Sequence, residues 1–366
     1  MSPIRILHVF GRLDRGGAET MVMNLYRNID RSLIQFDFAV HTNDDCDYDK
    51  EITELGGRIY HFPRFNGMNI IEYINCWEKF LYTHKEYKII HGHMYSIASV
   101  YLYIAKKYGC YTIAHSHNTS NGKGLKALIK DCFCFPLKYI CDYKMACGIE
   151  AAKWLFGNNI TEMENFKILN NAIDIKKYVN APEASIRFNL NNKIVLGHIG
   201  RFTKEKNHKF LIKVFYEYLK LNSEAVLLLM GRGKTEFQTK KLVEKLGLEN
   251  KVLFLGICDN VNEILQLIDA FVFPSMYEGL PVVLVEAQAA GVQCFISDNI
   301  ANEVCITECI NKLSLSLPAR KWAESILAKD LRHQDTNREI KVAGYDIVDT
   351  VAWISRFYLE RDRRNK

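Results

Sequence analysis

Two carboxylates, Glu278 and Glu286, lie with seven residues between them in the segment FPSMYEGLPVVLVEAQAAG, which spans residues 273–291. Pro281 suits the first turn of a helix because its missing N–H would be unpaired there, and residues 281–290 have a helical composition. We therefore expect Glu278 on a loop before the helix and Glu286 about a turn and a half inside it. Free N–H groups at such a terminus attract an anion, typically phosphate. The segment is also compatible with a strand–loop–helix corner whose glutamates are only solvated.

A basic segment, GRFTKEKNH at residues 200–208, follows an apolar run and carries Arg201 and Lys206. Two cations beside helix N-termini make a strong diphosphate site, because they neutralise charge while backbone N–H groups complete the hydrogen bonding. Taken alone, the segment is better explained as a solvated basic loop, so its meaning depends on the glutamates in the same half of the chain.

Two histidines, His115 and His117, lie with Asn118 where another apolar run ends. An imidazole there could accept a proton or hydrogen-bond a sugar hydroxyl. A single histidine is more often structural, but ligand sites of parallel sheets form at the carboxyl ends of strands. The binding and structural interpretations both stay open.

Glycine loops occur in both halves of the chain. Gly16 and Gly17 precede a predicted helix and would let a ligand approach the backbone closely, although a plain turn fits equally well. The Gly231-Arg-Gly233-Lys-Thr sequence superficially resembles a phosphate-binding P-loop, but the glycine that this motif requires five residues earlier is Leu228. A glycine turn beside the flat base of a ligand is the better interpretation.

These residues are positioned by short apolar strands that alternate with helices, a pattern typical of parallel sheets covered on both faces. In the first half we expect strands at residues 4–10, 36–41, 59–62, 89–91, 112–115, 143–147 and 167–169, and helices that include 18–29 and 70–81. In the second half we expect strands at 194–199, 225–230, 252–255, 270–273 and 293–296, and helices at 207–221, 237–246, 261–268 and 281–290. A polar stretch at residues 172–192 predicts the linker between them.

The sequence thus predicts an α/β protein with two tandem, doubly wound domains, at residues 1–180 and 190–343, facing a central cleft, and a terminal helix at 344–366. The length of 366 residues favours two cores over one. A net charge of +6 fits an anionic ligand or membrane surface but gives no argument for nucleic acid. Eleven scattered cysteines without a CxxC pair predict free thiols, and no apolar run reaches the ~18 residues of a spanning helix, so we expect a cytoplasmic protein that is at most peripheral to a membrane.

Three segments, EGLPVVLVEAQAAG, GRFTKEKN and GGAE at residues 16–19, together resemble the retaining glycosyltransferases of family four, which are GT-B-fold enzymes that use nucleotide-sugar donors. The two glutamates and their flanking glycines are the most specific part. The resemblance covers essentially the whole chain, including AHSHN, NNAID and SDNIANEV, and its style is that of bacterial capsule, exopolysaccharide or O-antigen transferases. The sequence departs from the family at Ala172, where glycine is usual, and lacks the usual glycine-rich loop after Ser297.

The resemblance implies a role for each matching residue. Arg201 and Lys206 would clasp the donor diphosphate, and Glu286 would hydrogen-bond the nucleotide ribose. Glu278, together with the backbone N–H groups that follow it at Gly279, Leu280 and Val282, would hold the sugar hydroxyls and distal phosphate. His117, more than His115, would lie near the reacting sugar. The remaining donor-site positions implied in this way are Gly16, Gly17, Gly231 and Gly233, and the terminal helix would pack back on the first domain.

The resemblance also implies the chemistry. A hexosyl or N-acetylhexosaminyl group would pass from a nucleotide-sugar, with UDP expected as the commonest nucleotide, to a lipid-linked saccharide, with retention and without a metal or other cofactor. Residues 124–143 mix lysines with aromatic and aliphatic residues, and we expect them to contact the membrane that carries such an acceptor, although part of their apolar face would be core. Two alternatives stay open, a nucleotide-sugar 2-epimerase of the same fold and a non-catalytic nucleotide-sugar-binding protein.

Overall fold

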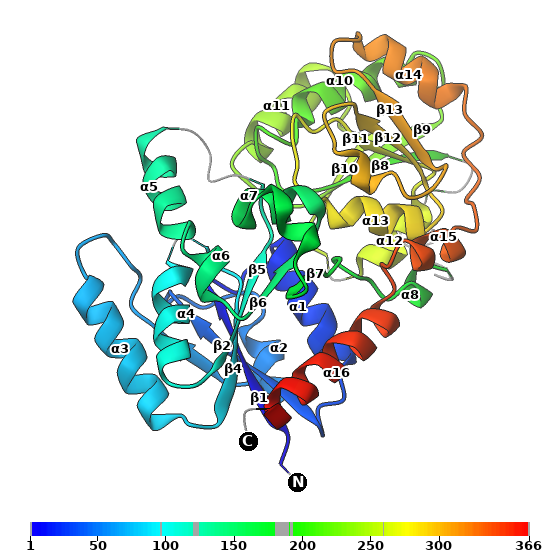
Figure 1. Cartoon of the computed structure of the whole chain (residues 1–366). Helices are drawn as coiled ribbons and strands as arrows, with labels where there is room; N and C mark the ends of the chain where they lie inside the picture. Colours follow the sequence, from blue (N-terminus) through cyan, green and yellow to red (C-terminus); the bar gives the residue numbers. More distant parts are fainter. Residues whose placement is uncertain are drawn as a thin grey trace. The chain divides into compact units, whose positions relative to one another are not determined.

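The computed structural model describes residues 2–95, 97–119, 124–179, 190, 193–258 and 260–364, except for the side chains of residues 125–127, 179 and 364. The chain divides into two compact units. The first consists of Met1–Ala172 with Ile347–Lys366, and the second of Ile173–Asp346. Each unit is a parallel sheet with helices on both faces, which confirms the predicted two-domain α/β architecture (Figure 1).

The first unit contains a parallel sheet in the order β3-β2-β1-β4-β5-β6-β7. The strands are β1 (Ile4–Phe10), β2 (Ile34–Val40), β3 (Ile59–His61), β4 (Tyr87–Gly92), β5 (Tyr111–Ser116), β6 (Tyr143–Ala146) and β7 (Phe166–Ile168). The order reverses between β1 and β4, which are neighbours. Ligands of doubly wound sheets bind at the carboxyl ends of strands beside such a reversal.

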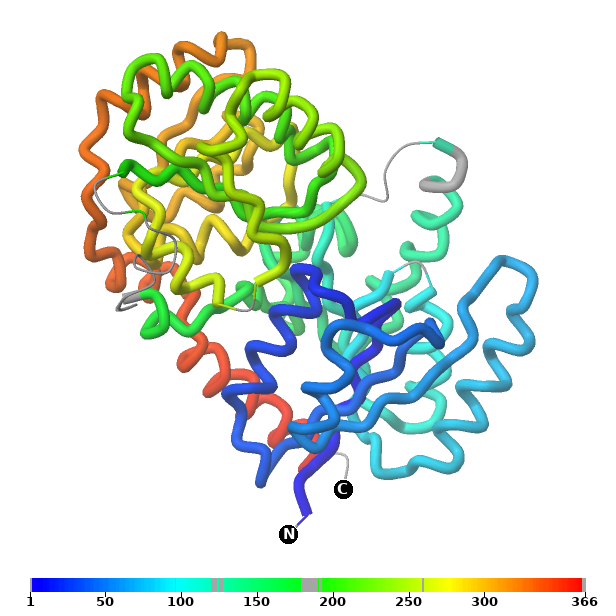
Figure 2. The backbone as a smooth tube through the Cα atoms, turned by 180° about the vertical axis from the view of Figure 1, so that it is seen from behind, coloured from blue at the N-terminus to red at the C-terminus, as the bar shows by residue number. Residues whose placement is uncertain are grey.

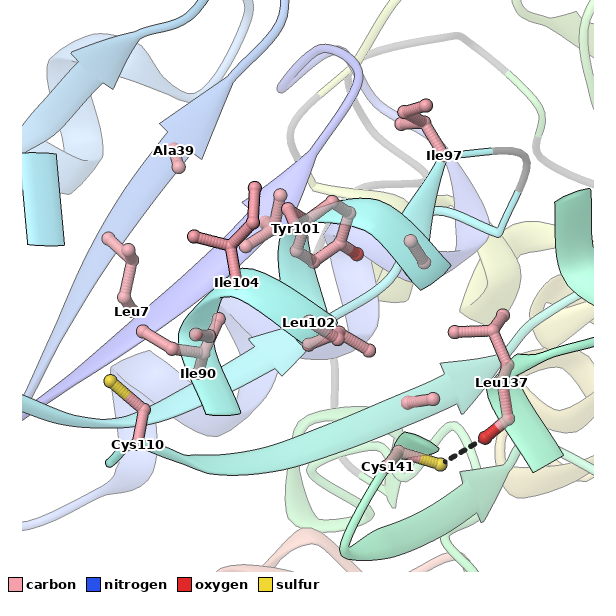
Figure 3. Close-up of a cluster of buried hydrophobic side chains, with 14 of the residues drawn as sticks. Leu7, Ala39, Ile90, Ile97, Tyr101, Leu102, Ile104, Cys110, Leu137 and Cys141 are labelled. Carbon is pink, nitrogen blue, oxygen red and sulfur yellow. Dashed lines mark hydrogen bonds between the residues drawn. The ribbon is translucent and has the colours of Figure 1, made fainter. Parts of the chain in front are cut away.

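Helices cover both faces of this sheet. They are α1 (Gly17–Asn28), α2 (Asp49–Glu54), α3 (Ile70–Thr83), α4 (Ala98–Lys107), α5 (Leu125–Cys134), α6 (Leu137–Ile140), α7 (Ile149–Phe156) and α16 (Ile347–Arg364), with a 3₁₀ turn, η1, at Asn158–Glu162. On one face, Tyr101 of α4 packs among Leu7, Ile90 and their neighbours (Figure 3). On the other face, α1 and α16 cover a core that includes Phe36 and Tyr358, and the two helices lie side by side (Figures 1 and 2).

The second unit contains a parallel sheet in the order β10-β9-β8-β11-β12-β13. The strands are β8 (Ile194–Ile199), β9 (Ala225–Met230), β10 (Val252–Gly256), β11 (Ala270–Phe273), β12 (Gln293–Ser297) and β13 (Ile310–Leu313). The helices are α8 (Lys176–Val179), α10 (His208–Leu219), α11 (Glu236–Lys245), α12 (Val261–Leu267), α13 (Val282–Ala289), α14 (Ala319–Leu327) and α15 (Asn337–Val342), with a 3₁₀ turn, η2, at Asn302–Val304. The reversal here lies between β8 and β11, so the loops that follow these two strands meet at one edge.

The pattern of buried side chains explains why these sequences form strands and helices. All six residues of β9, AVLLLM, are buried, as expected for a central parallel strand covered on both faces. In α10, Leu211, Val214 and Phe215 follow one another at helical spacing and are buried against the sheet. The predicted positions of β1, β8, β9 and β11 coincide with those in the structure.

The first unit ends eight residues before the boundary expected at residue 180. Ile173 forms a bridge with Asp346, and Ile175 and Tyr178 pack in the core of the second unit, so this stretch belongs to that unit rather than to a linker. Most of the predicted linker, residues 180–189 and 191–192, lies outside the described residues. The terminal helix begins at Ile347 rather than Gly344, because Gly344 has a left-handed φ of 82°.

None of the eleven cysteines forms a disulfide, which agrees with the thiols predicted from the sequence. Within the described residues, the structure contains no helix with both the length and the apolar character that crossing a membrane requires.

Candidate active site

An ion pair joins the two loops at the carboxyl edge of the second sheet. The Lys206 ammonium, on the loop after β8, lies 2.7 Å from Oε1 of Glu278, on the loop after β11. Both side chains are mostly buried, and the ammonium also lies over the ring of Phe273, 4.6 Å from its centroid. The sequence predicts that Lys206 and Glu278 belong to one site, and in the structure the two side chains are in contact.

Arg201 is not part of this contact. Its side chain is exposed and forms no hydrogen bond or ion pair with any residue that the structure describes. An unpaired guanidinium on the same loop as Lys206 is available to bind an anion from outside the protein, since its planar fork of donors matches phosphate oxygens.

Glu286 lies on α13 with a partly buried side chain. Burial raises the pKa of this carboxyl group, and a hydrogen bond donated by the Tyr178 hydroxyl to Oε1, at 2.9 Å, lowers it. The second oxygen, Oε2, has no partner within the described residues. Glu286 therefore keeps one free acceptor, and Tyr178, which the sequence analysis did not single out, occupies the other.

The N-terminus of α13 presents unpaired donors next to Glu278. The main-chain N–H groups of Gly279, Leu280 and Val282 donate to none of the described residues, and Pro281, which precedes the helix, has no N–H. Such N–H groups at a helix N-terminus favour an anion. The predicted helix start is confirmed within one residue.

Gly231 and Gly233 have a packing reason to be glycines, in addition to the predicted place beside a ligand. Their φ angles are 134° and 155°, and a Cβ would lie 2.2 Å from the carbonyl oxygen of Gly200 at the first and 2.4 Å from that of Phe202 at the second. The loop after β9 thus packs backbone to backbone against the loop that carries Arg201. Both residues lie at the predicted edge, and they shape the basic loop whether or not a base lies beside them.

Gly16 and Gly17 are placed at the start of α1, as expected, but no rigid neighbour excludes a side chain at either position. The carboxylate of Glu19 folds back to within 2.3 Å of where a Cβ of Gly16 would lie. A carboxylate at a helix N-terminus occupies the place that an anion would take.

Five histidines form an array on the α1 and α16 side of the first sheet. His8 of β1 pairs in register with His91 of β4, and His93 follows two residues later, while His115 and His117 lie two residues apart at the end of β5. His8, His91, His93 and His115 are at most 5% exposed, and His117 is partly buried. Of these five, only His115 and His117 are predicted from the sequence as site candidates, although two HxH pairs at neighbouring strand ends are a readable signal.

The array consists of two hydrogen-bonded chains. In one, His8 Nδ1 lies 2.9 Å from His93 Nε2, and His93 Nδ1 lies 2.9 Å from His117 Nε2. In the other, the hydroxyl of Tyr358 lies 2.7 Å from His91 Nδ1, and His91 Nε2 lies 3.2 Å from His115 Nδ1.

The Tyr358 hydroxyl determines which nitrogens donate and which accept in the second chain of hydrogen bonds. This group has no other partner among the described residues, so it donates its proton to His91 rather than leave a buried O–H unpaired. A neutral imidazole carries one proton, and His91 therefore donates from Nε2 to His115, which holds its own proton on Nε2.

Burial keeps these imidazoles neutral. Desolvation lowers the pKa of His8 and of His117 to about 3, and burial together with the neighbouring histidines lowers the pKa of His91, His93 and His115 well below the usual value. In this state His117 is a weaker base than an ordinary histidine, and its Nδ1 has no hydrogen-bond partner among the described residues.

Neutral imidazoles also bind transition metals, and two triads have nitrogens within 4.8 Å of one another, His8/His91/His93 and His93/His115/His117. Each triad, however, contains a stacked pair. The ring centroids of His91 and His93 are 4.4 Å apart at 24°, and those of His115 and His117 are 4.1 Å apart at 28°. A metal lies in the plane of every imidazole that binds it, so neither triad holds one ion without turning a ring.

Each unit is therefore a doubly wound parallel sheet with polar residues at its carboxyl edge, and a chain with two such domains in tandem has the organisation of the GT-B class. The crystal structure of Anabaena HepE in complex with UDP and glucose has the same fold, with a TM-score of 0.77, 17% identity, and coverage of 98% of this chain and 100% of that one. The family model described as "Glycosyl transferases group 1" matches residues 182–328, which include Arg201, Lys206, Glu278 and Glu286.

Two relatives extend the match. The chain is 34% identical over 374 residues to the putative glycosyltransferase EpsF of Bacillus subtilis, covering 97% of this chain and 96% of the relative. It is 23% identical to the UDP-Gal:alpha-D-GlcNAc-diphosphoundecaprenol alpha-1,3-galactosyltransferase of Escherichia coli, covering 61% of each. The chain belongs to the group 1 glycosyltransferases.

Proposed function

We propose that the protein transfers a hexosyl or N-acetylhexosaminyl group from a nucleotide-sugar, with UDP as the expected nucleotide, to a lipid-linked saccharide, with retention, in the synthesis of a bacterial surface polysaccharide. The observation that carries the proposal is the Lys206–Glu278 pair, with Nζ and Oε1 2.7 Å apart, at the reversal point of the second sheet. The free acceptor of Glu286 and the unpaired Arg201 belong to the same family-matched region.

In the proposed reaction, Arg201, Lys206 and the N-terminus of α13 stabilise the charge that develops on the leaving diphosphate. This electrostatic role is worth several kcal/mol and replaces a metal. As the bond between sugar and phosphate loosens, Glu278 exchanges its contact with Lys206 for the sugar hydroxyls. The acceptor hydroxyl attacks the same face, and its proton leaves with the phosphate oxygen, so that no enzyme nucleophile is required.

The lipid-linked acceptor is supported by the relative whose name includes an undecaprenyl diphosphate saccharide. It is also supported by the surface of α5 and α6, where Ile129, Phe135 and Tyr139 are 51%, 59% and 72% exposed. The Lys138 ammonium lies 3.7 Å from the ring centroid of Phe135, so charge and apolar surface are adjacent, as in helices that bind anionic membranes.

A nucleotide titration tests the donor assignment. Glu286→Ala removes the proposed acceptor for the ribose hydroxyls, and we expect affinity for UDP to fall about tenfold or more, since two hydrogen bonds to a charged group are lost. Glu308→Ala, which changes a carboxylate away from this edge, is the matched control. Unchanged affinity in Glu286→Ala would remove the basis of the assignment.

Membrane binding is tested by sedimentation with vesicles that contain anionic phospholipid. Replacing both Phe135 and Tyr139 by serine should release the protein, whereas Phe237→Ser, which changes a 64% exposed aromatic residue on α11, should not. Equal binding by all three proteins would contradict the assignment of this surface. The anomeric configuration of the product, determined by NMR, tests retention, and inversion would refute it.

A further inference from the structure

Tyr178 connects the short helix α8 to Glu286. Its hydroxyl donates to Glu286 Oε1 at 2.9 Å, and the tyrosine itself is only 8% exposed. Both residues belong to the second unit, although 108 positions separate them in the sequence. A bond of this separation depends on the fold and could not be predicted from the local sequence.

The main chain around Tyr178 is fixed by two side chains of α12. The Gln266 amide donates to the carbonyl of Tyr178, and the Asn262 amide donates to that of Lys177 at 3.1 Å. The Tyr178 ring lies in the same buried cluster as Leu284 and Val285 of α13. With its main chain bound to α12 and its ring packed against α13, Tyr178 keeps its hydroxyl at a fixed place beside the Glu286 carboxylate.

The hydrogen bond from Tyr178 changes the mobility and the protonation of the Glu286 carboxylate. The bond at Oε1 restricts rotation of the carboxylate and favours its charged form, while Oε2 stays without a partner among the described residues. A charged oxygen held in one orientation is a good acceptor for the vicinal hydroxyls of a ligand, because the entropy of ordering the side chain is already lost before binding.

We propose that Tyr178 is a positioning residue for nucleotide binding: its hydroxyl holds the Glu286 carboxylate by Oε1 and leaves Oε2 to accept hydrogen bonds from a vicinal diol of the ligand. This inference rests on the proposed donor-binding role of Glu286. It adds a residue from outside the family-matched residues 182–328, close to the start of the second unit.

The test is the pH dependence of UDP affinity in Tyr178→Phe, measured by calorimetry between pH 5.5 and 8.5. Loss of the hydroxyl removes the bond that lowers the pKa of Glu286, so the carboxyl takes up its proton at a higher pH. We expect the decline in affinity on acidification to begin at a higher pH than in the wild type, with about fivefold weaker binding at pH 7. A superimposable pH profile would overturn the proposal.

Tyr218→Phe is the matched control, because Tyr218 is a buried tyrosine of the same unit that lies in a different core cluster. It should lose stability without moving the pH profile. If both variants shift the profile equally, the effect is structural and the positioning role is wrong.

A second readout separates this inference from the proposed function. The Glu286 carboxyl ¹³C resonance, assigned by its absence in Glu286→Gln, should titrate at a higher pH in Tyr178→Phe even without nucleotide. If Glu286→Gln binds UDP as well as the wild type does, the proposed function fails, whereas an unchanged carboxyl titration in Tyr178→Phe refutes the positioning role itself.

Discussion

Acidification should destabilise the first unit sharply, because its histidine array is buried in the neutral form. In the unfolded chain each imidazole has a pKa near 6.5, and in the folded unit burial lowers the pKa of His8 and of His117 to about 3. Between these values the unfolded state binds more protons, so stability is complete above about pH 6.5 and is lost as the pH falls toward 3.

The magnitude follows from linkage. Between pH 7 and 5.5, each imidazole with these two pKa values reduces the free energy of unfolding by about 1.2 kcal/mol, so His8 and His117 together contribute about 2.5 kcal/mol. His91, His93 and His115 act with the same sign, since burial and neighbouring imidazoles lower their pKa values as well. The combined loss is a large part of the 5–15 kcal/mol that stabilises a typical domain.

Hydrogen exchange at pH 7 and 5.5, corrected for intrinsic rates, measures this loss separately for each unit. The second unit has His198 and His208, whose pKa values burial lowers, but burial raises the pKa of Asp269 and Glu286, an effect of opposite sign. We therefore expect β1, β4 and β5 to lose more protection than β8, β9 and β11. His8→Phe should reduce the pH dependence of the first unit by about 1.2 kcal/mol, and an equal loss in both units would refute the reasoning.

Three further results are expected. Glu278→Gln should lower kcat about a hundredfold and change UDP affinity less than about threefold, because its sugar contacts strengthen in the transition state; equal losses in both would contradict this split. Tyr358→Phe should allow His115 to adopt both tautomers, so that ¹⁵N NMR of its ring changes from the Nε2–H form alone to a mixture. An unchanged spectrum would show that the Tyr358 hydroxyl does not determine the protonation pattern of the histidines. Gly231→Ala should cost about 3 kcal/mol in denaturant unfolding, whereas Gly247→Ala, with a positive φ but open space, should cost about 1 kcal/mol; similar costs would refute the close-approach argument.

The fold was largely readable from the sequence, because parallel strands buried on both faces leave continuous apolar runs. β9 illustrates this, since all six of its residues are buried and both of its ends were predicted. β13 was missed because INKL is only partly buried at the edge of the sheet and lacks that apolar pattern. The stretch after Ala172 was read as linker from its polar composition, although Ile173, Ile175 and Tyr178 are spaced to pack into the second core.

Of the candidate site, the sequence predicted which residues lie at the carboxyl edges but not which of them touch. Lys206 is predicted to bind the donor diphosphate and Glu278 the sugar hydroxyls and distal phosphate, and only the structure shows that the two side chains pair with each other. The Tyr178 and Tyr358 hydroxyls could not be found in this way, because each meets its partner across more than a hundred residues. Gly231 and Gly233 lie at the predicted edge of the sheet, but their close packing against the backbone of Gly200 and Phe202 could not be predicted from the sequence.

The central claim is sugar transfer from a nucleotide donor to a lipid-linked acceptor. The most direct measurement incubates the purified protein with UDP-, GDP- and dTDP-sugars labelled in the sugar, with and without bacterial membrane lipids, and follows the label into the lipid fraction. We expect transfer from one of the donors, only when lipid is present, and its loss in Glu278→Gln. Conversion of the donor into an isomeric nucleotide-sugar without lipid would indicate an epimerase instead, and no change in any donor would contradict the account.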